Sequence, residues 1–360
     1  MMILYQTFRQ TTVYHNCVSS ILTHLKKRLQ HSCLSIVLLL SCFSLLPMKA
    51  QTLFRVMSYN VENLFDLKDD PTTDDNAFLP QGERHWHGKR YQHKLHQLSK
   101  VIMAAGEWDT PALIGLCEVE NETVLTDLLC RTPLKGLGYR FCITGHSDRR
   151  GLRVGLLYQP DRFKLIAQRS FSVRFTRKQH KSTREILYVS GQIITGDTLD
   201  LFVCHFPSRY GGEKESEPDR IDAAITLRHL TDSLSQCRHH PLLLVMGDFN
   251  DNPTDLSITH HLTGGCLHNL FQPHTQQPYP GTHKYRDSWS LFDQIFCNRT
   301  AETTDSFRPV EAGARIFAPD FLLIDDKTWL GKRPFRTYHG FRYEAGFSDH
   351  LPVIADFEIQ

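Results

Sequence analysis

An aspartate and a histidine stand side by side near the C-terminus, in the run Phe347-Ser348-Asp349-His350-Leu351. They precede an apolar run, residues 352–359, whose Val, Ile and Phe content is typical of a buried strand. Aspartate offers oxygen to a hard metal ion, and histidine can exchange a proton near neutral pH. Taken alone, the pair is better explained as a polar strand end than as a site. It gains weight because other strands of the chain end in the same way.

Four other apolar runs end in polar side chains that a buried strand does not need, and a fifth is interrupted by a carboxylate. The polar residues are Asn60-Val61-Glu62-Asn63, Glu118-Val119-Glu120-Asn121, His205, Gly247-Asp248-Phe249-Asn250 and, inside the run 291–296, Asp293. Each has a structural explanation of its own, as a cap, a helix start, a turn or a buried ion pair. Together they supply what hydrolysis of a phosphate ester requires: oxygen ligands for a divalent cation, a hydrogen-bond donor and a base.

The elements that must position these residues are strands with helices between them. Apolar runs bounded by Gly, Asn, Asp or Pro predict ten strands, over residues 54–59, 112–117, 140–144, 154–158, 165–175, 186–194, 199–205, 242–246, 291–297 and 353–359. Apolar residues at helical spacing predict helices over residues 91–105, 119–129 and 218–234. Several strands are apolar on both faces and need cover on both sides. We therefore expect an α/β (α+β) fold with two sheets packed face to face and helices outside.

Two long polar loops, residues 66–88 and 273–289, have the length at which loops are usually functional or mobile. Basic and aromatic residues lie in or beside loops at Arg149-Arg150, Arg153, 208–210, 283–286 and 332–336. From these we take four candidates for substrate binding: Arg153, Arg209, Lys284 and Tyr285. They could contact phosphates or stack on bases, and each could equally be a solvated surface residue. Trp86 and Trp289 fit either a pocket rim or the core.

The first 50 residues have the composition of an export signal. The basic run Lys26-Lys27-Arg28 precedes an apolar stretch, residues 34–46, and Ala50 provides a small residue for cleavage. This stretch is shorter than the roughly 20 residues that a membrane-spanning helix needs. We expect a cleaved signal peptide over residues 1–50, an exported protein and no stable membrane span. The alternative is lipidation at Cys42.

Charge and composition limit which ligands and which domain organisation the rest of the chain can have. Of its 360 residues, 41 are Lys or Arg and 39 are Asp or Glu. Five of the basic residues and no acidic ones lie in residues 1–50, so 36 stand against 39 in the remainder, a net charge of −3. No strong positive field therefore attracts it to nucleic acid, although a local basic groove is compatible with this balance. Without a linker or an internal repeat, residues 51–360 are predicted to form one domain. Cys117, Cys204 and Cys297 lie in apolar runs and are predicted core residues.

The ordered set of polar strand ends resembles the endonuclease/exonuclease/phosphatase superfamily. The matching residues are Asn60, Glu118, His205, Gly247-Asp248-Phe249-Asn250, Asp293 and Ser348-Asp349-His350. The resemblance extends from about Arg55 to the end of the chain, and segments 54–65, 84–94 and 334–343 are similar to a secreted bacterial subgroup. The superfamily includes deoxyribonucleases, abasic-site endonucleases, inositol polyphosphate phosphatases and neutral sphingomyelinases. The resemblance implies a four-layer sandwich of two mixed sheets flanked by helices.

The resemblance also implies roles for the residues around a metal ion. Glu118 would be the principal metal ligand, with Asn60 and Asp349 near the ion. His350 would be the general base or the electrostatic partner of the phosphate that is hydrolysed. Asp293 would accept a hydrogen bond from the His350 imidazole, which fixes its tautomer and raises its basicity.

Three further residues take roles around the phosphate by the same resemblance. Asp248 would orient or deprotonate the attacking water, Asn250 would hold the phosphate, and His205 would donate to a non-bridging oxygen. Whether His350 or Asp248 takes the proton stays open. The implied chemistry is in-line attack of water on phosphorus without a covalent enzyme intermediate.

The sequence thus predicts an exported phosphoesterase dependent on Mg²⁺ or Mn²⁺, most simply a monomeric, nuclease-like phosphodiesterase whose substrate is a phosphate ester such as nucleic acid. Two alternatives are an inositol-phosphate phosphatase and a sphingomyelinase-like phospholipase C. The net charge of −3 favours a small or lipid substrate, while the basic loops favour a polyanion. An alternative that is not an enzyme is a non-catalytic binding protein with the same fold. The retention of Glu118, Asp248 and His350 argues against it.

Overall fold

The computed structural model describes residues 25–29, 52–177, 183–271, 279–298 and 306–359. The fold considered below lies in the unit Thr52–Gln360. The predicted signal peptide lies outside the described residues except for 25–29, which are helical. Among the described residues, no helix combines the length and the apolar character needed to span a membrane.

Two mixed sheets form the centre of this unit. The first contains β1 (Thr52–Leu64), β2 (Leu113–Val119), β3 (Arg140–Ile143), β4 (Arg153–Tyr158), β13 (Arg308–Pro309), β14 (Arg315–Ile316) and β19 (Val353–Ile359). Its strand order is β13-β19-β1-β2-β4-β3, with β14 also paired to β19. Strands β1 and β19 are antiparallel, with Thr52 opposite Ile359, so the first and last strands of the unit are neighbours.

The second sheet contains β5 (Phe163–Phe171), β6 (Ile186–Ile193), β7 (Thr198–His205), β8 (Leu242–Asp248), β9 (Leu267–Asn269) and β12 (Asp293–Asn298). Its strand order is β5-β6-β7-β8-β12-β9. In each sheet one central pair is parallel, β1 with β2 and β7 with β8. Parallel neighbours bring the carboxyl ends of their strands to the same edge of a sheet, which is where the polar residues of the sequence analysis lie.

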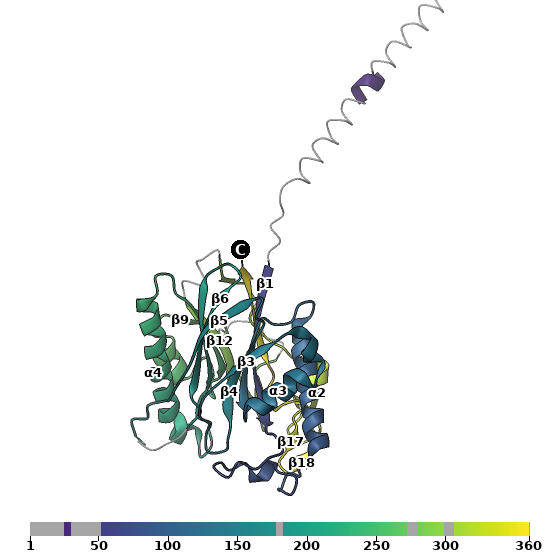
Figure 1. The fold of residues 1–360 in the computed structure, drawn as a ribbon, viewed down its shortest axis with the longest axis vertical. Helices are drawn as coiled ribbons and strands as arrows, with labels where there is room; N and C mark the ends of the chain where they lie inside the picture. Colours follow the sequence, from purple (N-terminus) through teal and green to yellow (C-terminus); the bar gives the residue numbers. More distant parts are fainter. Residues whose placement is uncertain (1–24, 30–51, 178–182, 272–278, 299–305, 360) are drawn as a thin grey trace, which may run out of the picture. The chain divides into compact units, whose positions relative to one another are not determined.

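Helices cover the outer faces of both sheets (Figure 1). The helices α2 (Gly88–Gly106) and α3 (Glu122–Cys130) lie on one side, and α4 (Glu213–Cys237) lies on the other. Buried residues of α2 include Leu95, Leu98 and Ile102, at the helical spacing that the sequence displays. Helix α4 begins five residues before its predicted start at Pro218, because its first turn is acidic rather than apolar and suits the positive end of a helix. The predicted four-layer α/β sandwich is confirmed.

Short elements fill the connections. Three two-stranded hairpins are β10 (His283–Tyr285) with β11 (Ser288–Ser290), β15 (Leu323–Asp325) with β16 (Lys332–Pro334), and β17 (Tyr338–His339) with β18 (Arg342–Tyr343). The short helical turns are η1 (Asn76–Phe78), η2 (Pro133–Leu137), η3 (Ser257–Leu262) and η4 (Asp320–Leu322). Trp86 is fully buried and its Nε1 donates to the backbone oxygen of Phe65, so Trp86 belongs to the core.

The two sheets approach each other closely behind the polar strand ends. A Cβ atom added to Gly115 in β2 would lie 2.7 Å from Met246 Sδ in β8. Cys117 Sγ lies 3.3 Å from the backbone oxygen of Cys204 in the other sheet. Cys117, Cys204 and Cys297 are buried, which confirms them as core residues. Small side chains here let the ends of both sheets meet.

Gly247, which precedes Asp248, occupies a conformation that other residues adopt only with strain. Its φ is 149°, and an added Cβ would lie 1.9 Å from the backbone oxygen of Cys204. We expect Gly247→Ala to lower the free energy of unfolding in urea by at least about 1 kcal/mol, because the backbone must shift. Gly136→Ala is the control, since no atom lies within 4 Å of an added Cβ there. Equal unfolding midpoints for the two variants would contradict this expectation.

Candidate active site

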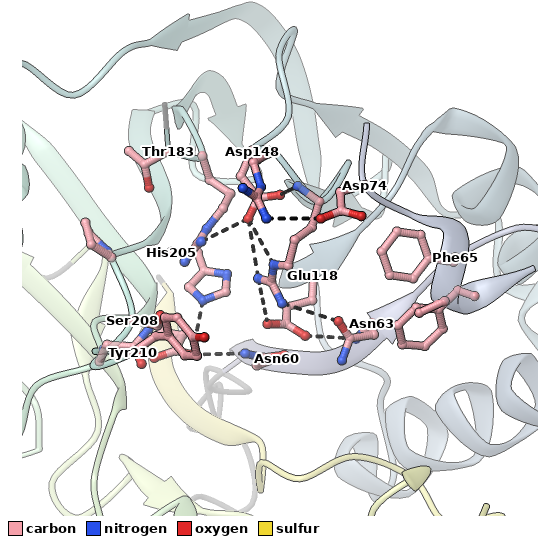
Figure 2. Close-up of a pocket in the computed structure, with 18 of the residues that line it drawn as sticks. Asn60, Asn63, Phe65, Asp74, Glu118, Asp148, Thr183, His205, Ser208 and Tyr210 are labelled. Carbon is pink, nitrogen blue, oxygen red and sulfur yellow. Dashed lines mark hydrogen bonds and ion pairs between the residues drawn. The ribbon is translucent and has the colours of Figure 1, made fainter. Parts of the chain in front are cut away.

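Polar residues from both sheets line one pocket with a volume of about 750 Å³ (Figure 2). The first sheet contributes the end of β1 and the end of β2, and the second contributes the ends of β7 and β8. Six of the residues predicted from the sequence line it: Asn60, Glu118, His205, Asp248, Asn250 and His350. Residues up to 290 positions apart in the sequence therefore meet at one pocket, as the polar residues at the predicted strand ends lead us to expect.

The register of the second sheet aligns three of the polar side chains. His205 is opposite Asp248 in the β7–β8 pair, and Asp248 is opposite Asp293 in the β8–β12 pair. His205 Nε2 lies 3.5 Å from Asp248 Oδ2. The imidazole of His350 contacts the same group, with Nδ1 2.7 Å from Asp293 Oδ2 and Nε2 3.8 Å from Asp248 Oδ2. The hydrogen bond from His350 to Asp293 is thus present as the family resemblance implies.

The backbone bends sharply where the strands reach the pocket. The register of β1 with β2 shifts between Asn60 and Leu64, which marks a bulge. The non-glycine residues with positive φ at the pocket edge are Glu62, Asn63, Glu118 and Asn250, with φ between 51° and 66°. Bulges and left-handed residues turn side chains away from the regular alternation of a strand. One result is that Glu118 Oε2 accepts a hydrogen bond of 2.9 Å from the backbone N–H of Asn63.

Asn60 joins the two sheets at the pocket. Its Nδ2 donates to Asp248 Oδ2 over 2.9 Å, and its Oδ1 accepts from the backbone N–H of Glu62. Its backbone oxygen accepts from the hydroxyl of Ser348 at 2.6 Å, and the same hydroxyl oxygen accepts from the backbone N–H of His350. Asn60 therefore fixes both Asp248 and the Ser348-Asp349-His350 run.

Burial and nearby charges shift the pKa values of the two pocket histidines in opposite directions. Burial acts to lower the pKa of His350, but the carboxylates of Asp293 and Asp248 outweigh it and raise this pKa to about 10. Burial, with the positive charges of Arg184 and Arg150, holds the pKa of His205 well below its usual range. At neutral pH, His350 is therefore protonated beside its two carboxylates, and His205 is neutral.

A buried lysine lies beneath the Ser348-Asp349-His350 run. Lys94 of α2 is 1 % exposed, and its Nζ donates to Thr337 Oγ1 and to the backbone oxygen of Phe347 at 2.6 and 2.5 Å. The Glu62 carboxylate accepts from the backbone N–H of Thr337 at 2.7 Å. Burial lowers the pKa of Lys94 to about 8 and raises that of Glu62 to about 7. Lys94 is not predicted from the sequence as a site residue, although a charge among the apolar positions of a helix would indicate it.

Two arginines and an aspartate on the pocket wall were also missed as site residues. Arg150, Arg184 and Asp148 all line the pocket, and Arg184 NH1 and Arg150 Nε lie 3.1 and 3.3 Å from Asp148 Oδ2. Arg150 also lies 3.5 Å from Glu118 Oε1. Arg149-Arg150 is predicted only as part of a basic loop, because sequence alone does not show that this loop lines the pocket.

The structure does not bring the predicted substrate-binding residues into the pocket. Arg153 lines a separate hollow beside Asp70. Arg209 is engaged by the backbone oxygen of Asn250 and by the buried carboxylate of Asp251. Both guanidinium groups lie beside acidic residues of the protein outside the pocket lining.

The other two predicted substrate-binding residues lie at the β10–β11 hairpin. Lys284 is buried, and its Nζ donates to Asp326 Oδ2 and to the backbone oxygen of Leu330. Tyr285 is 66 % exposed and does not belong to the pocket lining. Trp289 of β11 is half-buried and packs against the core. The neighbouring His283, which is not predicted as a site residue, contacts the His350 ring with 4.8 Å between ring centroids.

Acidic and imidazole groups suited to a metal ion occur on both sides of His350. Among the described residues, Asp248, Asp293 and His350 have ligand atoms within 4.8 Å of one another, and so do His283, Asp349 and His350. Asp293 Oδ1 is buried and has no hydrogen-bond partner. Carboxylate oxygens are the ligands that hard divalent cations prefer. The donor set therefore fits a divalent cation.

The three predicted metal ligands lie in or next to the pocket. Asn60 and Glu118 line the pocket, and Asp349 lies in the group with His283 and His350. Burial acts to raise the pKa of Asp349, but the charges of His350 and other nearby cations outweigh it and lower this pKa, so the carboxylate is ionised.

A model of the Endonuclease/Exonuclease/phosphatase family matches residues 55–358. The chain therefore belongs to this family, whose members are hydrolases acting on phosphoester bonds. The family resemblance stated from the polar strand ends is confirmed. No curated protein matches the chain.

Solved structures share the fold. An endonuclease/exonuclease/phosphatase family protein from Bacteroides thetaiotaomicron is 18% identical with a TM-score of 0.57, covering 86% of this chain and 99% of that chain. A mannosyl-6-phosphatase from the same organism is 20% identical with a TM-score of 0.55, covering 84% and 99%. TDP2 from D. rerio, complexed with single strand DNA product, is 17% identical with a TM-score of 0.51, covering 85% and 99%. At these identities the likeness establishes the fold.

The raised pKa of His350 predicts a pH-dependent contribution to stability. Since this pKa rises from 6.5 to about 10 on folding, the protonated imidazole contributes stability that is fully present below about pH 6.5 and lost as the pH rises through about 10. Asp293→Asn removes a charge that raises this pKa. We expect the difference in unfolding free energy between wild type and this variant to be largest near pH 6.5 and to shrink toward pH 10, in urea denaturation with chelator.

Asp232→Asn is the control, because it removes a carboxylate that pairs with Arg228 outside the pocket lining. Its effect on the unfolding free energy should not follow the same trend. A difference between wild type and Asp293→Asn that stays constant from pH 6.5 to pH 10 would contradict the assignment.

Proposed function

We propose that this protein is an exported, Mg²⁺-dependent phosphoesterase that acts as a nuclease-like phosphodiesterase. The observation that carries the proposal is the convergence of Asn60, Glu118, His205, Asp248 and His350 on one pocket, with the His350 imidazole bonded to Asp293. Oxygen ligands, a protonated imidazole and guanidinium groups in one hollow suit an anionic ester. The solved relatives include a protein with bound single strand DNA product, which supports a nucleic-acid substrate.

Glu118, Asn60 and Asp349 are the residues that we assign to holding the cation. A bound Mg²⁺ supplies positive charge that stabilises the negative charge developing on the phosphate. Glu118 presents Oε1 to the pocket beside Arg150, while Oε2 is held by the backbone N–H of Asn63. This carboxylate is therefore oriented before any ligand binds.

The chain's own residues bind the phosphate and handle the proton. The protonated His350 lies beside Asp248 and Asp293 and offers Nε2–H to a phosphate oxygen, which stabilises the negative charge of the ester. Asp248 lines the pocket and is held by Asn60 and by the backbone N–H of Asn250, so its carboxylate is fixed in position to orient the attacking water. Burial raises the pKa of Asp248, which makes it a better base. The neutral His205 donates a hydrogen bond to a non-bridging oxygen.

Purified protein lacking residues 1–50, supplied with Mg²⁺, tests the function directly. It would be offered plasmid DNA, RNA, mannose 6-phosphate, an inositol phosphate and sphingomyelin in parallel. Turnover of DNA or RNA supports the nuclease-like assignment. Turnover of only a monoester or of sphingomyelin replaces it by a phosphatase or a phospholipase C, and no turnover of any ester refutes the proposal. Export is tested separately, by fractionating cells and sequencing the N-terminus of the mature chain.

Removal of either central side chain should abolish most of the activity. We expect Glu118→Ala and His350→Ala each to lower kcat by at least about 10²-fold, the scale for losing one electrostatic stabiliser. Glu311→Ala and His260→Ala change exposed residues outside the pocket lining and serve as matched controls. Thermal unfolding of all four variants separates a lost site from a lost fold. Unchanged kcat in either pocket variant would refute the role assigned to that residue.

The metal requirement gives an independent test. A chelator should abolish turnover by the wild-type protein, and added Mg²⁺ should restore it, because the carboxylate-rich pocket depends on a cation to accept an anionic substrate. Initial rates measured before chelation, after it and after repletion provide the comparison. Activity that is indifferent to chelator would exclude a metal-dependent mechanism.

A further inference from the structure

Arg209 joins the loop that follows β7 to the loop that follows β8. Its Nε donates to the backbone oxygen of Asn250 at 2.8 Å. Its NH2 group donates to the carboxylates of Asp251 and Asp255 at 3.0 and 2.6 Å. The guanidinium carbon lies 4.9 Å from the centre of the Phe292 ring. Protein groups therefore surround this guanidinium and fix its position.

The neighbours of Arg209 in the sequence line the pocket, whereas Arg209 does not. Ser208 and Tyr210 belong to the pocket lining (Figure 2), and Arg209 lies outside it. Its side chain is 20 % exposed. Arg209 is therefore placed to act from behind the pocket surface and not on the substrate itself.

Asn250 is the pocket residue whose backbone Arg209 contacts. Its φ of 51° lies in the left-handed region, a conformation that non-glycine residues keep only where the surrounding structure holds it. The backbone N–H of Asn250 donates to Asp248 Oδ1 at 2.9 Å, and the backbone oxygen accepts from Arg209. One hydrogen bond on each side of the α-carbon thus holds this conformation.

The backbone conformation of Asn250 determines where its amide group lies. Nδ2 donates to the backbone oxygen of Phe206 at 3.1 Å, and because that oxygen can only accept, the NH2 end of the amide lies on this side. An amide NH2 group has two donors, so one remains for a phosphate oxygen in the pocket that Asn250 lines. Arg209 thus supports, through the main chain, a hydrogen-bond donor for an anionic ligand.

The carboxylate that holds Arg209 is anchored independently of it. Asp251 is 2 % exposed, pairs with the buried Arg220 over 2.7 Å and accepts from the Ser257 hydroxyl at 2.6 Å. Removal of the Arg209 guanidinium therefore leaves Asp251 paired, while the Asn250 oxygen loses a donor. Because of this, a positioning role of Arg209 can be separated from a role in the stability of the fold.

We propose that Arg209 is a positioning residue that acts through Asn250 and keeps the Asn250 amide directed at the phosphate of the substrate. This inference rests on the proposed function, in which the pocket binds a phosphate ester. Arg209 itself does not contact the substrate. Its effect on the reaction therefore depends on the presence of the Asn250 side chain.

A double-mutant cycle tests this dependence. Wild type, Arg209→Gln, Asn250→Gly and the double variant would be assayed with Mg²⁺ on bis(p-nitrophenyl) phosphate; glycine removes the amide and tolerates the positive φ. We expect Arg209→Gln to lower kcat about 10-fold and to change KM less than about 2-fold, because a misdirected donor is lost from the transition state. In the Asn250→Gly background, the same change should lower kcat less than about 2-fold.

The other outcomes of the cycle overturn the proposal. Equal losses of kcat in both backgrounds would show that Arg209 acts independently of Asn250. A loss carried by KM would assign Arg209 to direct substrate binding, and no loss in the wild-type background would leave it without a role in the reaction. Arg228→Gln is the matched control, since it removes a guanidinium from an ion pair outside the pocket lining and should keep kcat within about 2-fold of wild type.

The orientation of the amide gives a second measurement that needs no turnover. The side-chain NH2 of Asn250 would be followed by NMR on protein labelled with ¹⁵N-asparagine, assigned through its loss in Asn250→Gly. Its hydrogen exchange should be at least about 5-fold faster in Arg209→Gln than in wild type or Arg228→Gln, because the loop that carries it opens more easily. An unchanged exchange rate would overturn the positioning role. Absence of turnover by wild type instead refutes the proposed function and leaves the exchange measurement to decide the positioning.

Discussion

A buried hydrogen bond between the two sheets determines the geometry of the pocket. Asn60 Nδ2 of β1 donates to Asp248 Oδ2 of β8 over 2.9 Å, and both residues are almost fully buried. Losing one partner of such a bond leaves a polar group unsatisfied in the interior, which costs about 1–3 kcal/mol. The two side chains can reach each other because Gly115 and Cys117 let the sheets pack closely behind them. Asp248 in turn contacts His205 and His350.

The electrostatics of the pocket depend on the same packing. Burial would make Asp248, Asp293 and His350 costly as isolated charges, and their proximity lets one imidazolium offset two carboxylates. Lys94 and Glu62 are also buried, and they meet at Thr337, where Lys94 donates to the hydroxyl and Glu62 accepts from the backbone N–H. Buried polar groups of this kind stabilise little by themselves, but they specify one orientation for the side chains above them.

Much of this arrangement could be predicted from the sequence, because the strands are long and apolar. All ten predicted strands overlap observed ones, and the polar residues at their ends meet at one pocket. Strands of two or three residues, such as β13 and β17, carry no detectable pattern. Nor does local sequence distinguish Arg150, which enters the pocket, from Arg153, which lies beside other acids.

The path of β1 has a consequence for how the domain can be tethered. Its first residue, Thr52, pairs with Ile359 at the end of the sheet away from the pocket, and Asn60 follows eight positions later. At about 3.3 Å per residue, attachment point and pocket are separated by about 26 Å along the strand. A linkage at Thr52 would therefore attach at the end of β1 that lies away from the pocket.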